Sequence, residues 1–371
     1  MSPVSVPAAV LEQACAFGRT LESQTGARVD AEELLGGRAV LLGLSRAGRI
    51  SAGGATRLMA AQDGWCALTL SRPDDVAAVP ALLEVDAVPA DPWPAIGTRV
   101  RSGAAAVFAE RARLLGLPVG VLGETGPQDP VVRRSGDRRR PRPLSDLVVA
   151  DLSSMWAGPL CGALLARGGA TVVKVETRRR PDGTRAGPSP FFDWINGEKL
   201  SYRADFAQPD GLRRLLTAAD VVIESSRPGA LERHGLGPGD IPTRDGRVWV
   251  RVTGHGSTAA RCGWVGFGDD AAVSGGLVAG TPGSPEFCGD AIADPLTGMH
   301  AAGAVLRSMS AGGGEVVEVS LSGVAAGYAG LPRGDERPCT TTPSIPGRAA
   351  ELGADNARVD DMVDRRLVAA C

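Results

Sequence analysis

The stretch from Leu144 to Glu176 constrains the fold of this chain most strongly. It opens with the apolar run Leu147–Ala150, which is typical of a strand buried in a parallel sheet. After Asp151 a turn of small residues leads into apolar residues at helical spacing, and Gly168-Gly169 ends that helix. A second apolar run, Thr171–Val175, follows. Strand, turn, helix and strand in this order predict one half of a doubly wound nucleotide-binding unit.

The turn in this unit lacks the glycine fingerprint of dinucleotide-binding enzymes. That fingerprint reads Gly-x-Gly-x-x-Gly, whereas the turn here reads Ser153-Ser154-Met155-Trp156-Ala157-Gly158. The start of a helix directly after a strand still offers free backbone N–H groups to an anion. The stretch therefore predicts α/β topology and an anionic ligand, and it does not predict NAD.

The overall composition narrows the class of protein. The 371 residues are enough for two domains, and a net charge of −2 gives no general attraction to nucleic acid or to an anionic membrane. Seven cysteines form no Cys-x-x-Cys pair and only three histidines are present, so we expect neither a disulfide framework nor a metal site. The first residues lack the pattern of a signal peptide, and no run is apolar enough to span a bilayer. We expect a soluble, reduced, cytoplasmic protein.

The order of the patterns predicts two α/β domains. Residues 144–323 alternate strand-like and helix-like segments, which indicates a Rossmann-like, mainly parallel sheet. Residues 1–125 form a smaller α/β block, in which Trp65–Leu70 alternates like a half-buried strand after an Asp-Gly turn. Residues 126–143 are rich in Pro, Gly and Arg, which indicates a linker. Residues 324–371 form a polar tail that ends in a helical pattern.

Within the first block the local patterns predict further elements. Val10, Leu11, Cys15 and Phe17 favour an amphipathic helix. The apolar run Ala39–Leu44 predicts a strand or a packed turn. Pro73 opens a helical stretch that runs to Leu83 and that Pro80 breaks or kinks, and a further helix is expected over Phe108–Leu115.

Seven short segments between Leu144 and Gly323 occur in an order that is typical of one protein family. They are DLSSMWAGPL…LLARGGATVVKVE, NGEKLS, ADVVIESSRPGALERHGLGPGDI, VRVTGHG, GFGDDAAVSGGL, GDAIADPLTGMHAA and GEVVEVSLSG. In this order they resemble the class III CoA-transferases, the family that includes formyl-CoA transferase, carnitine CoA-transferase and the α-methylacyl-CoA racemases. The resemblance implies coenzyme A as a substrate, together with an acyl group and a carboxylic acid.

The first block carries a resemblance of its own. AAQDGWCALTLSRPDDVAAVPALL and RARLLGLPVGVLGE resemble the small domain of the same family. In the usual family order that domain follows the nucleotide-binding unit, whereas here it precedes it. We therefore expect a permuted or rearranged chain, and the alternative is a generic α/β domain.

The resemblance implies a carboxylate nucleophile. In the family an aspartate attacks the acyl-CoA thioester, and the matching segment here is Gly266–Asp270, in which Asp269 is our choice and Asp270 the alternative. A nucleophilic carboxylate must stay ionised, and a following helix offers N–H groups and a positive dipole end. The same two acids also fit a helix N-cap. The implied reaction passes through an aspartyl anhydride and an aspartyl-CoA thioester, without a metal.

The resemblance also implies residues that bind CoA. Arg185, in Asp-Gly-Thr-Arg, matches an arginine that holds the nucleotide end, and Arg233 matches a phosphate contact, with Lys199 as a further candidate. Ser225 and Ser226 stand where the family often has Asn-Phe beside the adenine.

Two short turns complete the candidate site. Gly254-His255-Gly256 follows a predicted strand and could supply backbone N–H groups to an oxyanion. We expect His255 to act as a shape or hydrogen-bonding residue rather than as a general base. Arg227, in Arg-Pro-Gly, is interpreted as part of a turn.

Two alternatives to an active transferase remain open. A racemase needs two bases on opposite faces of the α-carbon, and the family's racemases place a histidine before the aspartate, where this chain has Gly268. Asp294 matches a second acid of the family's motif, and we expect it to be structural. The other alternative is a non-catalytic CoA-binding partner subunit. The family implies a homodimer, and the rearranged order favours a hetero-oligomer as a further possibility.

Overall fold

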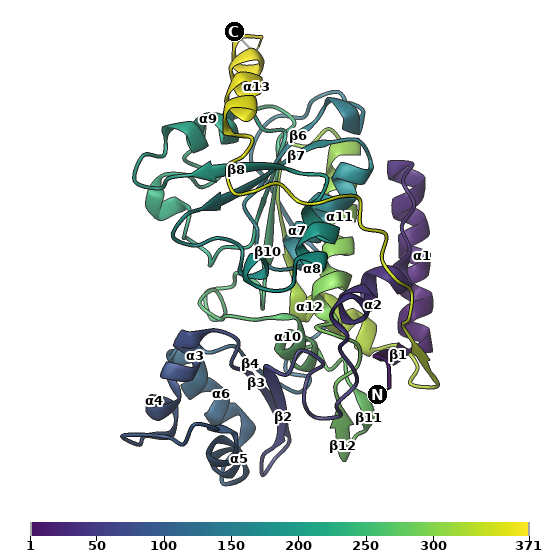
Figure 1. Cartoon of the computed structure of the whole chain (residues 1–371), viewed down its shortest axis with the longest axis vertical. Coiled ribbons are helices and arrows are strands. Elements are labelled where there is room, and N and C mark those ends of the chain that lie inside the picture. Colours follow the sequence, from purple (N-terminus) through teal and green to yellow (C-terminus); the bar gives the residue numbers. More distant parts are fainter. Residues whose placement is uncertain (1, 370–371) are drawn as a thin grey trace.

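A seven-stranded sheet forms the centre of the larger part of the molecule (Figure 1). The computed structural model describes residues 2–369. The strand order is β5-β13-β10-β9-β6-β7-β8, and all neighbours are parallel except the edge strand β5, which runs antiparallel to β13. The strands are β5 (Val131–Arg134), β6 (Val148–Asp151), β7 (Thr171–Thr177), β8 (Leu200–Ala204), β9 (Val221–Glu224), β10 (Val248–Thr253) and β13 (Glu315–Ser320). The predicted mainly parallel α/β sheet is confirmed.

The strand order reverses between β6 and β9. From β6 the chain adds β7 and β8 on one side, and then crosses back to add β9, β10 and β13 on the other. Ligands of open α/β sheets bind outside the carboxyl ends of the strands at such a reversal. We therefore expect a ligand to bind at the loops that follow β6 and β9.

Alternation along the strands divides the apolar core into two layers. Val149, Ile223 and Val250 face one layer, whereas their neighbours Val222 and Trp249 face the other. Both faces are covered because every strand in the middle of a parallel sheet must bury side chains on two sides.

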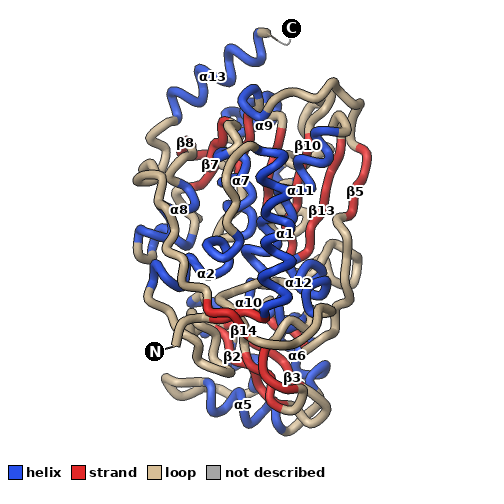
Figure 2. The backbone as a smooth tube through the Cα atoms, turned by 90° about the vertical axis from the view of Figure 1, so that its right-hand side faces the viewer, coloured by secondary structure: helices blue, strands red, loops and turns tan. Residues whose placement is uncertain are grey.

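Helices cover both faces of this sheet. On one side lie α7 (Ala157–Arg167), α8 (Ser189–Asn196), α11 (Ala293–Ser310) and α12 (Leu321–Ala329), and on the other lie α9 (Asp210–Ala218) and α13 (Asn356–Val368). Helix α10 (Gly268–Ser274) contributes to the same apolar core as the first group. Figure 2 shows α1 (Ala8–Thr25) lying along α11 as an outer layer. The predicted N-terminal amphipathic helix and the predicted closing helix are confirmed.

The predicted strand or packed turn at Ala39–Leu44 is wrong. These residues belong to α2 (Ala31–Leu42), whose N-cap Asp30 accepts hydrogen bonds from the backbone N–H groups of Glu32 and Glu33. The apolar run is the C-terminal half of a buried helix, which periodicity in a short window does not distinguish from a strand. Residues of α1 and α2 share one hydrophobic core with the main sheet.

A three-stranded antiparallel sheet lies beyond the carboxyl ends of the main strands (Figure 1). Its own small core is enclosed by four helices. The elements are β2 (Thr56–Ala60), β3 (Trp65–Thr69), β4 (Val119–Val121), α3 (Pro73–Ala77), α4 (Val79–Leu83), α5 (Trp93–Arg101) and α6 (Ala105–Leu114). The predicted strand at Trp65 is confirmed, and the helix expected from Pro73 is broken at Ala78, just before Pro80.

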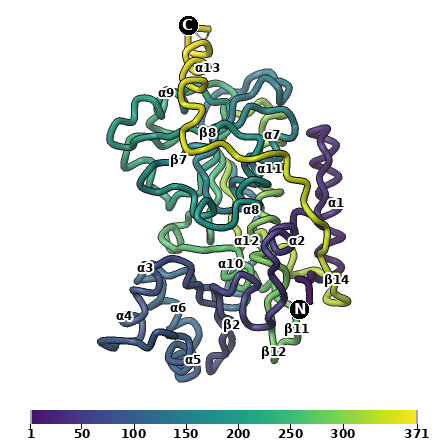
Figure 3. Tube along the Cα trace, in the orientation of Figure 1, coloured from purple at the N-terminus to yellow at the C-terminus, as the bar shows by residue number. Residues whose placement is uncertain are grey.

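The remaining segments are an edge strand, the connection to α13 and several short strands and turns. Residues 131–134, within the predicted linker, form the edge strand β5. The segment that follows β14 runs back along the main domain to α13 (Figure 3). The short elements are β1 (Ser5–Pro7), β14 (Glu336–Pro338), β11 (Ala279–Thr281), β12 (Ser284–Glu286) and the 3₁₀ turns Leu144–Asp146, Gly183–Ala186 and Glu232–His234.

The domain limits at residues 125, 143 and 323 stay predictions. Within residues 2–369, no helix combines the length and apolar character needed to cross a membrane.

Candidate active site

Helix α10 lies at the junction between the main sheet and the small sheet. It packs against β3 and β4 on one side and against α11 and α12 on the other. The approach to β4 is close, because a Cβ atom added at Gly120 would lie 2.2 Å from the carbonyl oxygen of Asp270. Helix α10, whose N-terminus carries the predicted nucleophile, is thus positioned by the small sheet and by two helices of the main domain.

Three aspartates and one arginine meet at this N-terminus, and we call them the acid cluster. Asp269 belongs to α10, Asp290 and Asp294 flank the start of α11, and Arg38 comes from α2. Arg38 Nη1 lies 2.6 Å from Asp290 Oδ1. The cluster therefore gathers four charged groups from parts of the chain that are more than 200 residues apart.

The two oxygens of Asp269 both accept hydrogen bonds. Ala291 donates its backbone N–H to Oδ1 at 3.1 Å, and the Thr56 hydroxyl donates to Oδ2 at 3.3 Å. Ala291 has a φ of 44°, a left-handed conformation that costs energy for a residue with a Cβ atom. Such strain is typical of functional sites, and here it aims the Ala291 N–H at Asp269.

The Asp294 carboxylate accepts fewer hydrogen bonds than that of Asp269. Asp294 is the second residue of the 18-residue helix α11, and its Oδ2 accepts the backbone N–H of Gly268 at 3.1 Å. Its Oδ1 takes no hydrogen bond from residues 2–369, and the side chain is only half-buried. Asp294, which the sequence predicts to be structural, therefore lies in the acid cluster with one oxygen available.

Gly268 is required by this geometry. A Cβ atom at this position would lie 2.3 Å from the Ala291 carbonyl oxygen and 2.5 Å from Asp294 Oδ2. No side chain fits there without displacing Asp294. A histidine before Asp269 would therefore clash with Ala291 and Asp294.

Burial and mutual repulsion make these acids weaker than usual. Burial and the nearby Asp290 raise the pKa of Asp269 to about 6, although Arg38 opposes the shift. Burial and Asp269 raise the pKa of Asp294 to about 7, again against Arg38. Both pKa values lie close to neutral pH, as expected of a site in which several carboxylates share one arginine.

Asp270 faces the opposite way, into the protein. Its Oδ1 accepts from the Thr69 hydroxyl at 2.8 Å and from the backbone N–H of Phe267 at 3.0 Å, which caps α10. Burial raises the pKa of Asp270 to about 8. The side chain has no exposed surface, which argues for a structural role rather than for a nucleophile.

His255 also lies in the interior. Its Nε2 is 4.0 Å from Asp270 Oδ2, and its Nδ1 is 3.4 Å from the Ser274 hydroxyl. Burial lowers the pKa of His255 to about 3, with Arg113 and Arg261 acting in the same direction. A neutral, enclosed imidazole fits the expected shape or hydrogen-bonding role. Nearby, Gly256 donates its N–H to Thr253 Oγ1 at 3.0 Å, and Gly254 packs against Gly266.

We predict that Asp270 makes the protein less stable as the pH rises. Its pKa is about 8 in the folded state against about 3.9 when unfolded, so the folded state binds the extra proton between these values. The free energy of unfolding should fall by up to about 1.4 kcal/mol per pH unit over this window. Asp270→Asn keeps the Oδ1 acceptor and removes this contribution, so its urea unfolding should depend less on pH than that of the wild type. Asp86→Asn, at an exposed position, is the matched control and should keep the wild-type slope.

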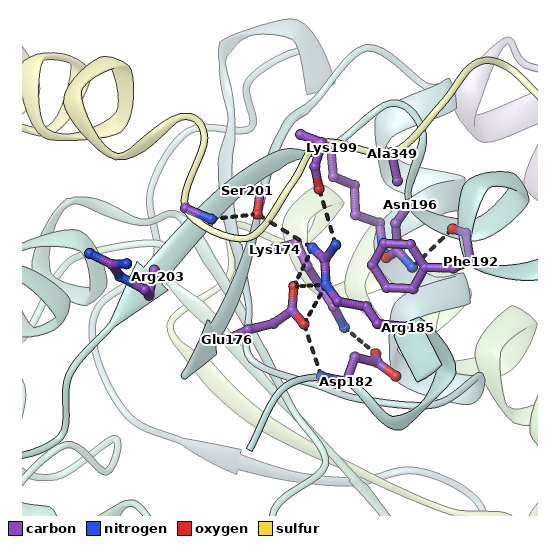
Figure 4. Close-up of polar contacts among 12 residues, drawn as sticks. Lys174, Glu176, Asp182, Arg185, Phe192, Asn196, Lys199, Ser201, Arg203 and Ala349 are labelled. Atoms are coloured by element: carbon purple, nitrogen blue, oxygen red, sulfur yellow. Dashed lines mark hydrogen bonds and ion pairs between the residues drawn. The ribbon is translucent and has the colours of Figure 1, made fainter. Parts of the chain in front are cut away.

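Arg185 lies in a second polar network at the carboxyl end of β7, and Lys199 lies beside this network (Figure 4). Arg185 holds Glu176 with two nitrogens, including Nη2 to Oε2 at 2.7 Å, and its guanidinium lies 4.2 Å from the centre of the Phe192 ring. Asp182 Oδ2 accepts from Lys174 Nζ at 2.7 Å. Arg185 is therefore already paired within the protein.

Lys199 is enclosed under α7. Its Nζ donates to Asp151 Oδ2 at 2.8 Å and to the Pro159 carbonyl at 2.7 Å, and 1% of its side chain is exposed. Because its ammonium group is buried and already hydrogen-bonded, Lys199 is not accessible to a phosphate group. Lys174 and Lys199 are the only lysines of the chain, and both are buried.

The two loops at the strand-order reversal contact one another. The backbone N–H of Ser154, after β6, donates to Ser225 Oγ, after β9, at 3.1 Å. Ser225 and Ser226 are half-buried. Met155, next to Ser154, has a φ of 74°, so a second strained residue lies at this edge.

A group of arginines borders the junction between the two sheets. Arg227 lies beside Gly116 of the small domain, to whose carbonyl Arg72 donates at 3.3 Å. Partial burial and the nearby Arg72 and Arg180 lower the pKa of Arg227, and Arg233 acts in the same direction. Arg72 also lies 5.6 Å from the ring centre of Phe267, which precedes α10. We call Arg72, Arg180, Arg227 and Arg233 the arginine group.

Sequence reasoning missed Arg38, Asp290, Arg72 and Arg180, whereas it named Arg233 as a phosphate contact and interpreted Arg227 as part of a turn. The local pattern around Arg38 gives no sign of chemistry, because its partner lies 252 residues away. GDAIAD places two acids four residues apart before a helix, which is a signal that could have drawn attention to Asp290 and Asp294 together. In the part of the chain that the structure describes, no group of three or more His, Cys, Asp or Glu residues has the arrangement of a metal site.

Comparison with known proteins assigns the chain to a family. Residues 144–346, more than half of the chain, match CoA-transferase family III. Succinyl-CoA–D-citramalate CoA-transferase of Chloroflexus aurantiacus is 33% identical over 202 residues, which are 50% of this chain and 50% of the relative. The beta subunit of succinyl-CoA–L-malate CoA-transferase of the same organism is 32% identical over 198 residues, 48% of this chain and 49% of the relative.

Part of the chain is also similar to solved structures. The crystal structure of the protein Rv3272 of Mycobacterium tuberculosis is 32% identical, with a TM-score of 0.46, and the match covers 51% of this chain and 57% of that one. The chain spans about half the length of the curated relatives it matches. Through residues 144–346, which carry the main sheet except its edge strand β5, together with α10 and the acids at the start of α11, this chain belongs to CoA-transferase family III.

Proposed function

We propose that this chain transfers CoA between an acyl-CoA thioester and a carboxylic acid, with a carboxylate of the acid cluster as the nucleophile. The observation that supports this most directly is Asp294, an accessible aspartate at the start of a long helix with one oxygen free. Asp269, the residue that the sequence favours, uses both oxygens within the protein. The contacts therefore favour Asp294 over Asp269 as the attacking group.

The reaction proceeds by acyl transfers that need no net proton. The ionised Asp294 attacks the thioester carbonyl, the C–S bond breaks, and a mixed anhydride and CoA thiolate form. The thiolate then attacks the aspartyl carbonyl carbon, which gives an aspartyl-CoA thioester and releases the donor acid as a carboxylate. The carboxylate of the acceptor acid repeats these two steps in reverse and leaves as a new acyl-CoA. The N–H of Gly268, which already holds Asp294 Oδ2, is placed to stabilise negative charge on that oxygen.

The arginine group is the proposed site for the phosphates of CoA. Guanidinium groups suit phosphate oxygens, and Arg227 and Arg72 meet at Gly116 close to the start of α10. Within the group, Arg72 is already paired with Asp75, so Arg180, Arg227 and Arg233 are the members proposed to bind phosphate. Arg185 and Lys199 are likewise paired with acids of the protein. Ser225 and Ser226 remain candidates for the adenine end, since they border the strand-order reversal.

A partner subunit is the second candidate function. One relative is itself a subunit of a two-subunit transferase, and this chain spans about half the length of its relatives. The chain would then need a second copy or a different chain to complete the site. A racemase is disfavoured because the position before Asp269 admits only glycine.

The test is isotope exchange with the purified chain. Succinyl-CoA and ¹⁴C-labelled dicarboxylic acids are the first substrates to try, because the relatives are named for succinyl-CoA, citramalate and malate. We expect label to enter the CoA thioester in proportion to enzyme concentration. CoA binding without label transfer, at any chain concentration, would contradict the transferase and support the partner subunit.

A further inference from the structure

Arg38 enters the acid cluster from outside the part of the chain that matches the family. It lies on α2, whereas the match begins at residue 144. Its Nη1 donates to Asp290 Oδ1 at 2.6 Å, and 24% of the Arg38 side chain but only 1% of the Asp290 side chain is exposed. The pair is therefore largely withdrawn from solvent, where an ion pair acts strongly on its neighbours.

The guanidinium of Arg38 is held in place on several sides. Its centre lies 5.7 Å from the ring centre of Trp156 and 5.6 Å from that of Phe191. A Cβ atom added at Gly53 would lie 3.2 Å from Nη2. Aromatic rings, a backbone turn and a carboxylate thus fix the charge, with little freedom for the side chain to move away.

Two further acids lie close enough to the pair to interact with it electrostatically. Asp269 comes from α10 and Asp294 from α11, and Cys288, in the loop that leads to Asp290, interacts with Asp269. Burial raises the pKa of Asp290, and Arg38 opposes this shift, as it does for Asp269 and Asp294. Among the charges that act on Asp294, Asp269 has the largest effect and raises its pKa, Arg38 has the next largest and lowers it, and Asp290 has the smallest and raises it.

We propose that the Arg38–Asp290 ion pair favours the ionised form of Asp294, and that Arg38 is in this sense a positioning residue for the transfer reaction. The inference rests on the proposed function, in which Asp294 attacks as a carboxylate. The pair leaves a net attraction on Asp294, because Arg38 acts on it more strongly than Asp290 does. Arg38 is not itself assigned a contact with substrate.

The proposal predicts an order of titration midpoints for Asp294. Asp290→Asn leaves Arg38 unpaired, so the midpoint should fall below that of the wild type. Arg38→Gln removes the attraction, so the midpoint should rise by about one pH unit. The double variant should lie between the wild type and Arg38→Gln, because it loses both charges. Arg38→Lys keeps the charge and should stay near the wild type.

The experiment is carbon-13 NMR of the full chain labelled at the aspartate carboxyl carbon, titrated from acid to alkaline pH. The Asp294 signal is identified by its loss in Asp294→Asn, and Arg19→Gln, at an exposed position of α1, is the matched control. Circular dichroism confirms folding, and if Arg38→Gln does not fold, Asp290→Asn and Arg38→Lys carry the test. Equal midpoints in the folded variants, or a rise in Asp290→Asn, would overturn the proposal.

This readout separates the inference from the function. The NMR titration needs no substrate, so the expected order of midpoints supports the ion-pair proposal even in a chain that transfers no CoA. If the chain transferred CoA but the Asp294 midpoint were the same in all folded variants, the ion-pair proposal would be rejected and the proposed transferase function would stand. With an active chain, the acid limb of the pH–rate profile should move in the same directions as the midpoints.

Discussion

Replacing Asp294 by Asn is expected to lower kcat for CoA transfer by about 10⁴-fold or more. Asn keeps the size of the side chain and an oxygen that accepts the Gly268 N–H, but it has no carboxylate to attack the thioester. The loss should therefore appear in kcat, with the affinity for CoA unchanged. Initial rates of label exchange, together with calorimetric titration of CoA, measure the two quantities separately.

Asp269→Asn is the matched variant for this prediction. Asp269 lies in the same cluster and accepts hydrogen bonds from Ala291 and Thr56, so its replacement should disturb the site without removing the nucleophile. We expect a loss of about tenfold or less. If Asp269→Asn lost activity as completely as we expect for Asp294→Asn, and Asp294→Asn remained active, the roles would have to be exchanged.

Replacing Lys199 by Met is expected to lower the free energy of unfolding by about 3–5 kcal/mol. The change leaves the Asp151 carboxylate buried, with no exposed surface, after losing its 2.8 Å partner. Burial alone would raise the pKa of Asp151, but Lys199 and Lys174 hold it below its usual value. Urea unfolding followed by tryptophan fluorescence measures the loss.

Two comparisons make this prediction specific. In Lys199→Met with Asp151→Asn no carboxylate is left without its partner, so the double variant should recover part of the stability. Arg203→Met replaces another long cation, at an exposed position of β8, and should change the stability by less than about 0.5 kcal/mol. Equal losses in Lys199→Met and Arg203→Met would show that the buried pair has no special importance.

The central βαβ unit was predictable because its information is local. The run before Asp151, the helical spacing after it and the run Thr171–Val175 each specify an element, and β6, α7 and β7 follow them closely. The small domain's strand at Trp65 was predictable for the same reason. A buried helix such as α2 was not, since its last turns are as uniformly apolar as a buried strand.

The candidate site was predictable only in part. The sequence located the start of α10, because Asp269 and Asp270 stand where a helix begins. It did not reveal which acid points inward, since that depends on how α10 packs against Thr69 and β4. It also did not predict that Arg38 lies beside Asp290, or Arg72 beside Arg227. These residues come together only through tertiary packing, and no local sequence pattern indicates that they are neighbours.

The most direct test of the central claim is to trap the acylated aspartate. The folded chain is incubated with an acyl-CoA and hydroxylamine, which converts an activated aspartyl group into a hydroxamate, and is then digested with trypsin. The four candidate acids, Asp269, Asp270, Asp290 and Asp294, lie on one peptide, residues 262–307, so fragmentation of that peptide identifies the modified residue. We predict a hydroxamate at Asp294 that depends on the acyl-CoA. A hydroxamate at another acid, or none in a chain that exchanges label, would contradict the account.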